Sequence, residues 1–290
     1  MRLLAILIDI IVCMMPLEGT IVNTAVYRIP YSYGDEIHLR PLFDLHIGHK
    51  LCNERKLRQY MANSPEGSYF VMGGDILDSV IIPDKRYSKS ADASASGAIV
   101  DDQIDRAYEI LKPYRERILS AIDGNHEQTI IKSCGTNPTK RLCELLSTDS
   151  HKVDYLGTKS VLKLMMHDNM SRIRTVKVYM HHGSGGGAQT AGGDLTKYER
   201  KAMDYNMDIF LYGHTHGKDI HPIIYYDFSG DNLITKRRLI CVCGTYLESN
   251  KIDSGVDDYA EAKDLRPKEI GGIDIGILPK SIGFDLWGTV

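Results

Sequence analysis

The sequence has no Cys-x-x-Cys pair, and its six cysteines are scattered over 290 residues. Cys241 and Cys243 are two positions apart in a strand-like segment, which is a poor spacing for a disulfide. The cysteines therefore do not predict a disulfide-stapled secreted fold. We expect all six thiols to be reduced, which favours a cytoplasmic protein, or one of the host cytoplasm if the chain is viral.

Long hydrophobic runs are also absent. The apolar segment at the N-terminus is interrupted by Asp9 and is too short to span a bilayer. It resembles a short signal peptide, but no small-x-small cleavage site follows it cleanly. We expect residues 1–26 to be an N-terminal extension whose role the sequence leaves open, with export by this segment as the alternative. No membrane partner is expected.

The sequence lacks a strong charge of either sign and a long basic tract interleaved with aromatic residues. The formal net charge of -3 argues against nucleic-acid binding through a wholly basic surface, although a local basic groove stays open. The missing basic tract disfavours high-affinity binding of single strands. No motif for a nucleophilic serine or cysteine is evident either.

What the sequence does contain is an alternation of strand-like and helical segments, followed by a mostly strand-like second half. Hydrophobic residues make up 43% of the chain, which is ample for a large core. This order predicts one α/β domain of two packed sheets over residues 27–290. We expect strands over 37–43, 68–73, 117–122, 159–167, 172–180, 208–212, 220–227, 236–243 and 280–287, helices over 54–63, 101–116, 137–148 and 194–206, and a loop over 84–99.

Coordinating side chains follow five of the expected strands. Because ligands of open α/β sheets bind outside the carboxyl ends of strands, these side chains can meet at one rim. Carboxylate, imidazole and amide oxygen together suit Mn²⁺, Fe, Zn²⁺ or Mg²⁺. A carboxylate can also bridge two cations. The five groups are Asp44-Leu45-His46, Gly74-Asp75 with Asp78 nearby, Asn125-His126-Glu127, His181-His182, and His214-Thr215-His216.

These motifs occur in the order seen in calcineurin-like metallophosphoesterases, and the chain resembles that superfamily over residues 44–216. The resemblance implies a two-sheet sandwich flanked by helices (α/β/β/α) and a hydrolase that uses two divalent metal ions. Mn²⁺ is the metal we expect first. A glycine-rich segment over residues 181–193 is similar to a loop in a phage and bacterial branch of the superfamily.

The resemblance also implies roles for individual residues. His126 would not be a ligand; it would face the substrate phosphate and stabilise developing charge or protonate the leaving oxygen. Asp75 would bridge the two metals. One metal would be held by Asp44, His46 and His216, and the other by Asn125, His214 and either His181 or His182.

Two points of the motif stay open in the sequence. The run His181-His182-Gly183 fits two patterns of the superfamily that disagree about the ligand, and we favour His182 slightly. Glu127 either supports the local structure, which we favour, or orients His126. In the glycine-rich segment, the backbone N–H groups of Gly185, Gly186 and Gly187 could cradle a substrate anion, or the segment is a flexible linker.

The expected function is therefore phosphoester hydrolysis, by a phosphodiesterase or nuclease acting on nucleic acid or nucleotides. The alternative is a phosphomonoesterase that acts on phosphoproteins or nucleotides. A remote alternative from another class is a metal-stabilised scaffold that binds a partner without turnover. The sequence leaves the oligomeric state open.

Overall fold

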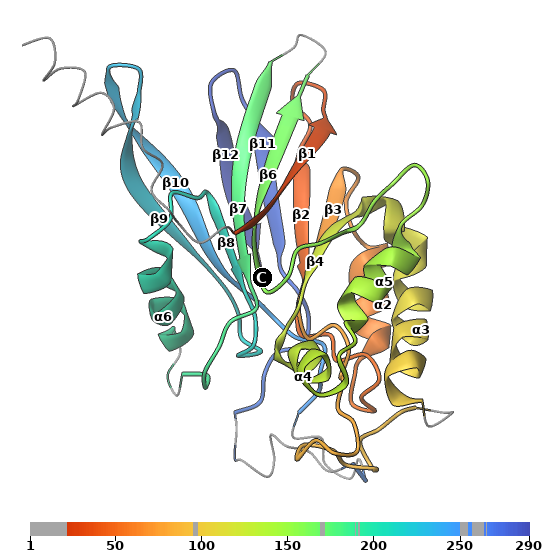
Figure 1. Cartoon of the computed structure of the whole chain (residues 1–290). Helices are drawn as coiled ribbons and strands as arrows, with labels where there is room; N and C mark the ends of the chain where they lie inside the picture. Colours follow the sequence, from red (N-terminus) through yellow and green to blue (C-terminus); the bar gives the residue numbers. More distant parts are fainter. Residues whose placement is uncertain are drawn as a thin grey trace, which may run out of the picture.

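Two six-stranded sheets face each other in the computed structural model, and helices cover their outer faces (Figure 1). The order of layers confirms the expected α/β/β/α sandwich. The structure describes residues 22–94, 98–168, 172–188, 190, 192–249, 255, 256, 264 and 266–290. Most of the expected N-terminal extension, residues 1–21, lies outside the described residues.

The first sheet combines pairs of consecutive strands with pairs that are distant in sequence. Its edge strand β1 pairs in parallel with β6, and β10 joins β8 in parallel and β9 in an antiparallel hairpin. Buried and exposed positions alternate along β6, as expected for strands with two different faces. In spatial order the strands are β1 (Asn23–Pro30), β6 (Lys159–His167), β7 (Ile173–His181), β8 (Ile209–Tyr212), β10 (Asn232–Cys243) and β9 (Lys218–Ser229).

The second sheet has a parallel centre that is covered on both sides. Strands β2 and β4 are buried at every position, which is typical of parallel strands between two layers. The sequence of β4 is accordingly almost entirely apolar, whereas β2 also buries His38 and Arg40. In spatial order the strands are β12 (Phe284–Thr289), β11 (Asp274–Pro279), β2 (Ile37–Leu42), β3 (Ser68–Gly73), β4 (Ile118–Ile122) and β5 (Asp154–Tyr155).

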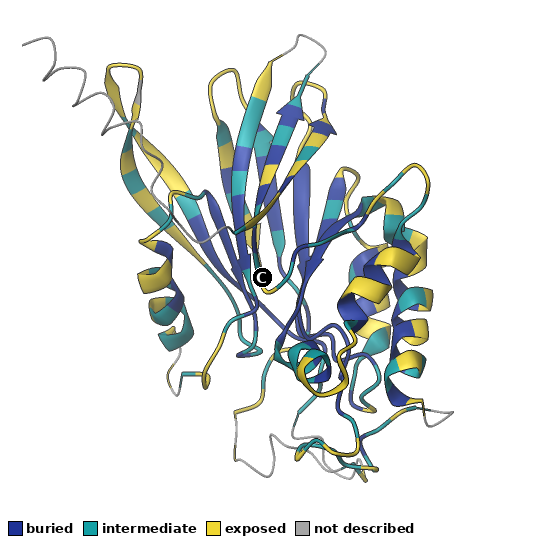
Figure 2. Ribbon diagram, viewed as in Figure 1, coloured by how far each residue is buried: buried dark blue, intermediate teal, exposed yellow. Residues whose placement is uncertain are grey.

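The helices bury their apolar faces against the outer sides of the sheets. On the second sheet lie α2 (Glu54–Ala62), α3 (Ile99–Leu111) and α5 (Pro138–Leu146), and on the first lies α6 (Gly193–Ala202). Figure 2 shows the buried residues concentrated along the facing strands and on the inner sides of the helices. A separate core fills the space between the sheets. Helix α4 (Asn125–Cys134) lies at the end of the sandwich, beside the loops that follow the strands.

Some expected boundaries were wrong. The strand expected over 280–287 covers a turn and only part of β12, because Gly283 takes a positive φ of 71° in the turn that joins β12 to the preceding strand β11. The helix expected over 101–116 ends at Leu111 and continues as a 3-10 helix, η1 (Lys112–Arg117), with Pro113 in its first turn. Strand β1 begins at Asn23 and thus crosses the boundary expected at residue 26.

Two expected absences can be checked only in part. The described cysteines, Cys52, Cys134, Cys143, Cys241 and Cys243, are free thiols. Among the described residues, no helix is long and apolar enough to cross a membrane.

Candidate metal centre

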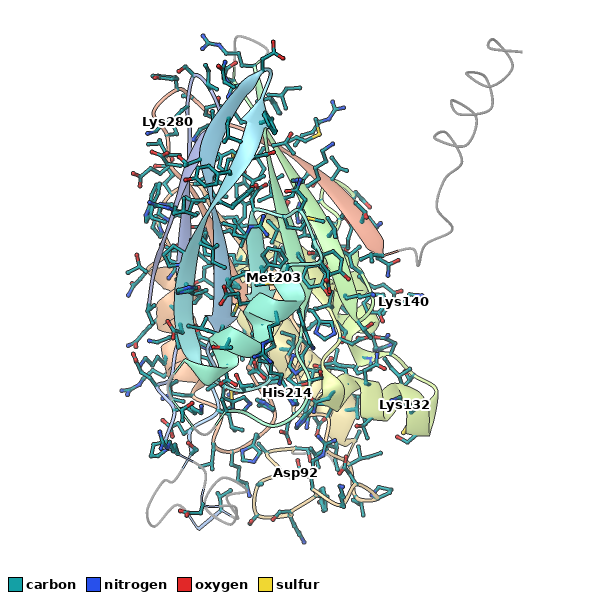
Figure 3. All side chains as sticks on the ribbon, turned by 90° about the vertical axis from the view of Figure 1, so that its left-hand side faces the viewer. Asp92, Lys132, Lys140, Met203, His214 and Lys280 are labelled. Carbon is teal, nitrogen blue, oxygen red and sulfur yellow. The ribbon has the colours of Figure 1, made fainter. Side chains whose placement is uncertain are left out.

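The residues singled out at the strand ends gather at one end of the sandwich. In Figure 3, His214 lies toward this end, whereas Lys280 marks the opposite end. The parallel strands β2, β3, β4 and β8 all direct their carboxyl ends to the same rim. The loops after these strands therefore bring together residues that are up to 170 positions apart, as in the contact between Asp44 and His214.

The backbone at this rim is held in an unusual conformation. Five residues of the motifs have positive φ values between 48° and 71°: Asp44, His46, Asp75, His214 and His216. Side chains other than glycine rarely adopt this region, and each instance costs about 1–3 kcal/mol. Hydrogen bonds hold these turns; for example, the N–H of Asp44 donates to Gly74 O at 3.1 Å and that of His46 to Asp75 O at 3.0 Å. Strain concentrated in this way is typical of functional sites.

One group of potential ligands consists of Asp44, His46 and His216. Their ligand atoms all lie within 4.8 Å of one another. The Nε2 atoms of the two histidines are 3.2 Å apart, and Nε2 of His216 lies 3.4 Å from Oδ1 of Asp44. Asp44 is fully buried, and its carboxylate also accepts the N–H of His214 at 2.9 Å.

A second group lies beside the first and consists of Asp75, His182, His214 and Asn125. Oδ1 of Asn125 lies 3.1 Å from Nε2 of His182 and 2.7 Å from Nδ1 of His214. Oδ2 of Asp75 lies 3.2 Å from Nε2 of His182 and 4.0 Å from Nε2 of His46, which belongs to the first group. Asp75 thus lies between the two groups.

The structure separates the two adjacent histidines. His182 is buried, and its Nδ1 donates to Gly73 O at 3.0 Å, which leaves Nε2 directed at the second group. His181 is the last residue of β7, where successive side chains point to opposite faces of the sheet. Its Nδ1 accepts the N–H of Gly183 at 2.9 Å, and its ring contacts Tyr212. Of the pair, only His182 reaches the centre.

The electrostatics of the site favour a bound cation. Burial raises the pKa of a carboxylate, yet the pKa of Asp75 is held well below its usual range, above all by His182 and His126. Burial would conversely lower the pKa of His182, but Asp75 and Asp44 raise it to about 10. Two carboxylates buried this deeply are costly without positive charge beside them. The oxygen and nitrogen donors fit divalent ions such as Mn²⁺, Fe²⁺ or Zn²⁺.

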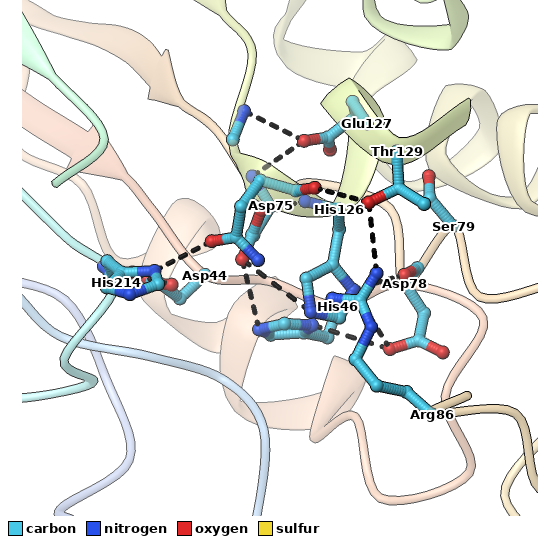
Figure 4. A network of polar contacts seen from close by, with 12 residues as sticks. Asp44, His46, Asp75, Asp78, Ser79, Arg86, His126, Glu127, Thr129 and His214 are labelled. Atoms are coloured by element: carbon cyan, nitrogen blue, oxygen red, sulfur yellow. Dashed lines mark hydrogen bonds and ion pairs between the residues drawn. The ribbon is translucent and has the colours of Figure 1, made fainter. Parts of the chain in front are cut away.

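His126 stands beside these groups at the start of α4. Its backbone N–H donates to Oδ1 of Asp75 at 2.9 Å, and its Nδ1 donates to the carbonyl oxygen of Asp78. Its Nε2 lies 3.9 Å from Oδ2 of Asp75. The imidazole is therefore fixed at Nδ1 and presents Nε2 toward the centre (Figure 4).

Comparison with known proteins agrees with this geometry. The family model described as calcineurin-like phosphoesterase matches residues 44–218, which is more than half of the chain. The chain belongs to this family. The family binds divalent metal ions, and the two Asp/His groups of this chain are where such ions would be held. No curated protein matches the chain significantly.

Solved structures that are similar to this chain are distant from it in sequence. Vps29 from Cryptosporidium parvum is 15% identical, with 88% of this chain and 97% of that chain covered and a TM-score of 0.34. The calcineurin-like phosphoesterase YfkN from Bacillus subtilis is 12% identical, with 88% and 90% covered and a TM-score of 0.39. GAP50 of Plasmodium is 10% identical, with 83% and 81% covered and a TM-score of 0.45. The comparisons do not support placement in a phage and bacterial branch.

Glu127 supports the local structure of the site. It is fully buried, and its carboxylate accepts the backbone N–H groups of Gly124, Asp75, Ile76 and Leu77 at 2.7–3.0 Å. Burial and the charge of Asp75 raise the pKa of Glu127 to about 7, while these N–H donors favour the ionised form. These contacts join the loop after β3 to the turn before α4, in agreement with the structural role expected.

Asp78 was noted beside the Gly74-Asp75 motif but was given no role, and Arg86 was not predicted, although both lie in the site (Figure 4). Oδ1 of Asp78 lies 3.4 Å from Nδ1 of His46 and 3.8 Å from Nδ1 of His126, so its carboxylate faces both rings. Its position three residues after Asp75 in the sequence was the available signal. Arg86 comes from a loop without periodicity, where no sequence pattern distinguishes it.

The glycine-rich segment runs along the edge of the centre. A Cβ atom added to Gly187 would lie 3.7 Å from Cβ of Thr215, the residue between His214 and His216. A Cβ atom on Gly185 would lie 3.6 Å from Nζ of Lys197, and one on Gly186 would meet nothing within 4 Å. Gly187 thus lies beside the His214-Thr215-His216 motif, Gly185 lies beside Lys197, and the space around Gly186 is open. Gln189 and Ala191 of this segment lie outside the described residues.

Proposed function

We propose that this chain is a dinuclear-metal-dependent phosphoester hydrolase that cleaves phosphodiesters of nucleic acids or nucleotides. The observation that carries the proposal is the position of Asp75, whose Oδ2 lies 3.2 Å from His182 and 4.0 Å from His46. A carboxylate shared by two groups of ligands is what a two-metal hydrolase needs, because the two ions act on the same phosphate.

Each group would hold one divalent ion, with Asp75 as the bridge. Asp44, His46 and His216 would bind one ion, and Asn125, His182 and His214 the other. Mn²⁺ is the first candidate, and Fe, Zn²⁺ or Mg²⁺ are the alternatives, since no thiolate is present. When bound, such ions neutralise charge on phosphoryl oxygens and lower the pKa of a water molecule that attacks phosphorus.

His126 would then protonate the leaving oxygen. The carbonyl oxygen of Asp78 can only accept a hydrogen bond, so Nδ1 of His126 carries a proton. Nε2 is the nitrogen that is left to gain and give up a second proton. The hydrogen bond from the His126 backbone to Asp75 keeps the ring beside the bridging position.

The surroundings of the centre support a nucleotide-like substrate. Beside the loop after β3 lies a hollow of about 410 Å³ whose lining includes Lys50, Ile82, Tyr87 and Lys89, together with the acidic residue Asp92. Lys50 follows His46 closely in the sequence, and its N–H donates to Ala91 O, so the hollow adjoins the metal-binding loop. Two ammonium groups, an aromatic ring and an aliphatic side chain suit a charged, planar group such as a nucleotide. Gly185, Gly186 and Gly187 border the other side and would bind an anion through their N–H groups.

The test is hydrolysis by purified protein loaded with Mn²⁺. The substrates are bis-p-nitrophenyl phosphate, p-nitrophenyl phosphate and a dinucleotide, with His126→Ala as the inactive reference. Faster cleavage of the diesters supports the proposal, and faster cleavage of the monoester shows the alternative, a phosphomonoesterase. If metal-loaded protein cleaves none of them, the proposed activity is wrong and a binding scaffold becomes the better explanation.

A further inference from the structure

Arg86 projects from the loop after β3 toward the helix that carries His126. Its Nε and Nη2 atoms donate to both carboxylate oxygens of Asp84 at 2.6–3.2 Å, and Nη2 also donates to Oγ1 of Thr129 at 3.2 Å. Thr129 Oγ1 in turn donates to Asn125 O at 2.9 Å. The guanidinium group is therefore held at two points, and one of them is on α4.

The anchor on α4 places Arg86 next to the proposed reaction centre. Thr129 lies three residues after His126 and four after Asn125, and residues at these spacings share one face of a helix. Figure 4 shows the Arg86 side chain beside His126 and Asp78. The negative charges of Asp75 and Asp78 act on Arg86, although the largest influence on its pKa is the hydrogen bond that it donates to Asp84, which raises the pKa.

Two of the five N–H donors of Arg86 are left over. Nε and both hydrogens of Nη2 are used by Asp84 and Thr129, whereas Nη1 has no hydrogen-bond partner among the described residues. The side chain keeps 26% of its surface exposed, while Asp84 keeps only 5%. An arginine with a buried anchor and a free, solvent-facing end suits the binding of a phosphate oxygen, for which its planar fork is well shaped.

We propose that Arg86 binds a non-bridging oxygen of the substrate phosphate on the His126 side of the centre, and that Asp84 is the positioning residue that aims it. This inference rests on the proposed phosphoester hydrolysis. It assigns a substrate contact to a loop residue outside the metal motifs. In the transition state the phosphoryl oxygens carry more charge, so the contact strengthens there.

The experiment compares Arg86→Ala, Arg86→Lys and Asp84→Asn in protein loaded with Mn²⁺. Arg86→Ala should lower kcat/KM for bis-p-nitrophenyl phosphate about a hundredfold, as expected for the loss of one transition-state donor. Its affinity for inorganic phosphate, measured as a competitive inhibition constant and by calorimetry, should fall about tenfold. Arg86→Lys should recover part of kcat/KM and part of the phosphate affinity, because the positive charge remains. Asp84→Asn should raise KM more than it lowers kcat, because the guanidinium group stays but loses its orientation.

Arg106→Ala is the matched control. Arg106 forms the same two-point ion pair, with Glu54 at 2.7 and 2.9 Å, but on the surface of α3. Arg106→Ala should leave the affinity for phosphate unchanged. It should shift the melting temperature about as much as Arg86→Ala does. If Arg86→Ala binds phosphate and turns over like the wild type, Arg86 only fastens its loop and the inference is wrong. If Arg86→Ala does not fold, equal phosphate affinity in wild type, Arg86→Lys and Asp84→Asn overturns it instead. A wild type that neither hydrolyses esters nor binds phosphate would overturn the proposed function itself.

Discussion

The carboxylate of Glu127 accepts the backbone N–H of Asp75 at 3.0 Å, although the two residues are 52 positions apart. The same carboxylate accepts the N–H groups of Ile76, Leu77 and Gly124. One buried side chain thus joins the loop after β3 to the turn before α4. These two segments carry the bridging aspartate, Asn125 and His126, so their relative position depends on Glu127.

Replacing Glu127 by alanine should destabilise the fold by about 3 kcal/mol or more, because four N–H groups lose their acceptor in a buried site. Glu127→Gln should recover part of this, since an amide oxygen can still accept two of them. Urea unfolding in the presence of a chelator measures the effect without a contribution from metal. Glu144→Gln, at an exposed position of α5, is the control and should stay within about 0.5 kcal/mol. A similarly small effect for Glu127→Ala would contradict the prediction.

His181 and His182 give a second test, because they are adjacent in the sequence but have different surroundings in the structure. His182→Ala removes a side chain directed at Asn125 and Asp75, so the variant should bind one metal ion per chain where the wild type binds two. His181→Ala removes a ring that contacts Tyr212 and should still bind two. Elemental analysis of gel-filtered protein measures the ratio. Loss of metal in His181→Ala alone would show that the assignment of His182 is wrong.

The motif residues could be predicted because a strand end fixes where the next few side chains lie. Asp44, Asp75 and Asn125 follow short, mainly apolar strands, so both the strands and their ends are visible in the sequence. Arg86 was missed, and Asp78 was noted without a role, because loop conformation decides their positions. That conformation depends on contacts with distant residues, such as that of Arg86 with Thr129.

The choice between His181 and His182 needed the structure for a different reason. Successive residues at a strand end point to opposite sides, and the sequence does not show which side faces the centre. In the structure, Nε2 of His182 lies 3.1 Å from Oδ1 of Asn125, whereas the His181 ring lies beside Tyr212. The turn between β11 and β12 was hidden in a similar way, because Gly283 makes a turn inside the segment 280–287, which reads as one strand.

Removal of metal should lower the melting temperature, and the difference should grow with pH. In the metal-free protein, the His182 imidazolium supplies positive charge between Asp44 and Asp75, and these carboxylates raise its pKa from 6.5 to about 10 against the effect of burial. A group whose pKa is raised by folding stabilises the fold fully at pH values below its pKa in the unfolded chain. This stabilisation is lost as the pH rises toward the pKa of the group in the folded protein. The metal-free protein should therefore become less stable as the pH rises from 6.5 to about 10. Over the same range its affinity for metal should increase, because protons compete less for the ligand atoms.

Scanning calorimetry of protein with Mn²⁺ and with chelator, at several pH values in this window, measures the difference. At a metal concentration a hundredfold above Kd, the gain is about 2.7 kcal/mol. Asp75→Asn, which removes the charge shared by both groups, should show a smaller gain. A difference in melting temperature that shrinks as pH rises would contradict the account of His182.

The turn at Gly124 gives the last prediction, because two segments of the site meet there without room for a side chain. A Cβ atom on Gly124 would lie 2.0 Å from Oδ1 and 2.3 Å from the backbone nitrogen of Asp75. Gly124→Ala should therefore push the bridging carboxylate away, cost about 2 kcal/mol of stability and reduce metal content. Gly186→Ala is the control near the same site, since its Cβ would meet nothing within 4 Å. It should keep its metal and its stability. Equal metal content in the two variants would show that Asp75 can move without loss of the centre.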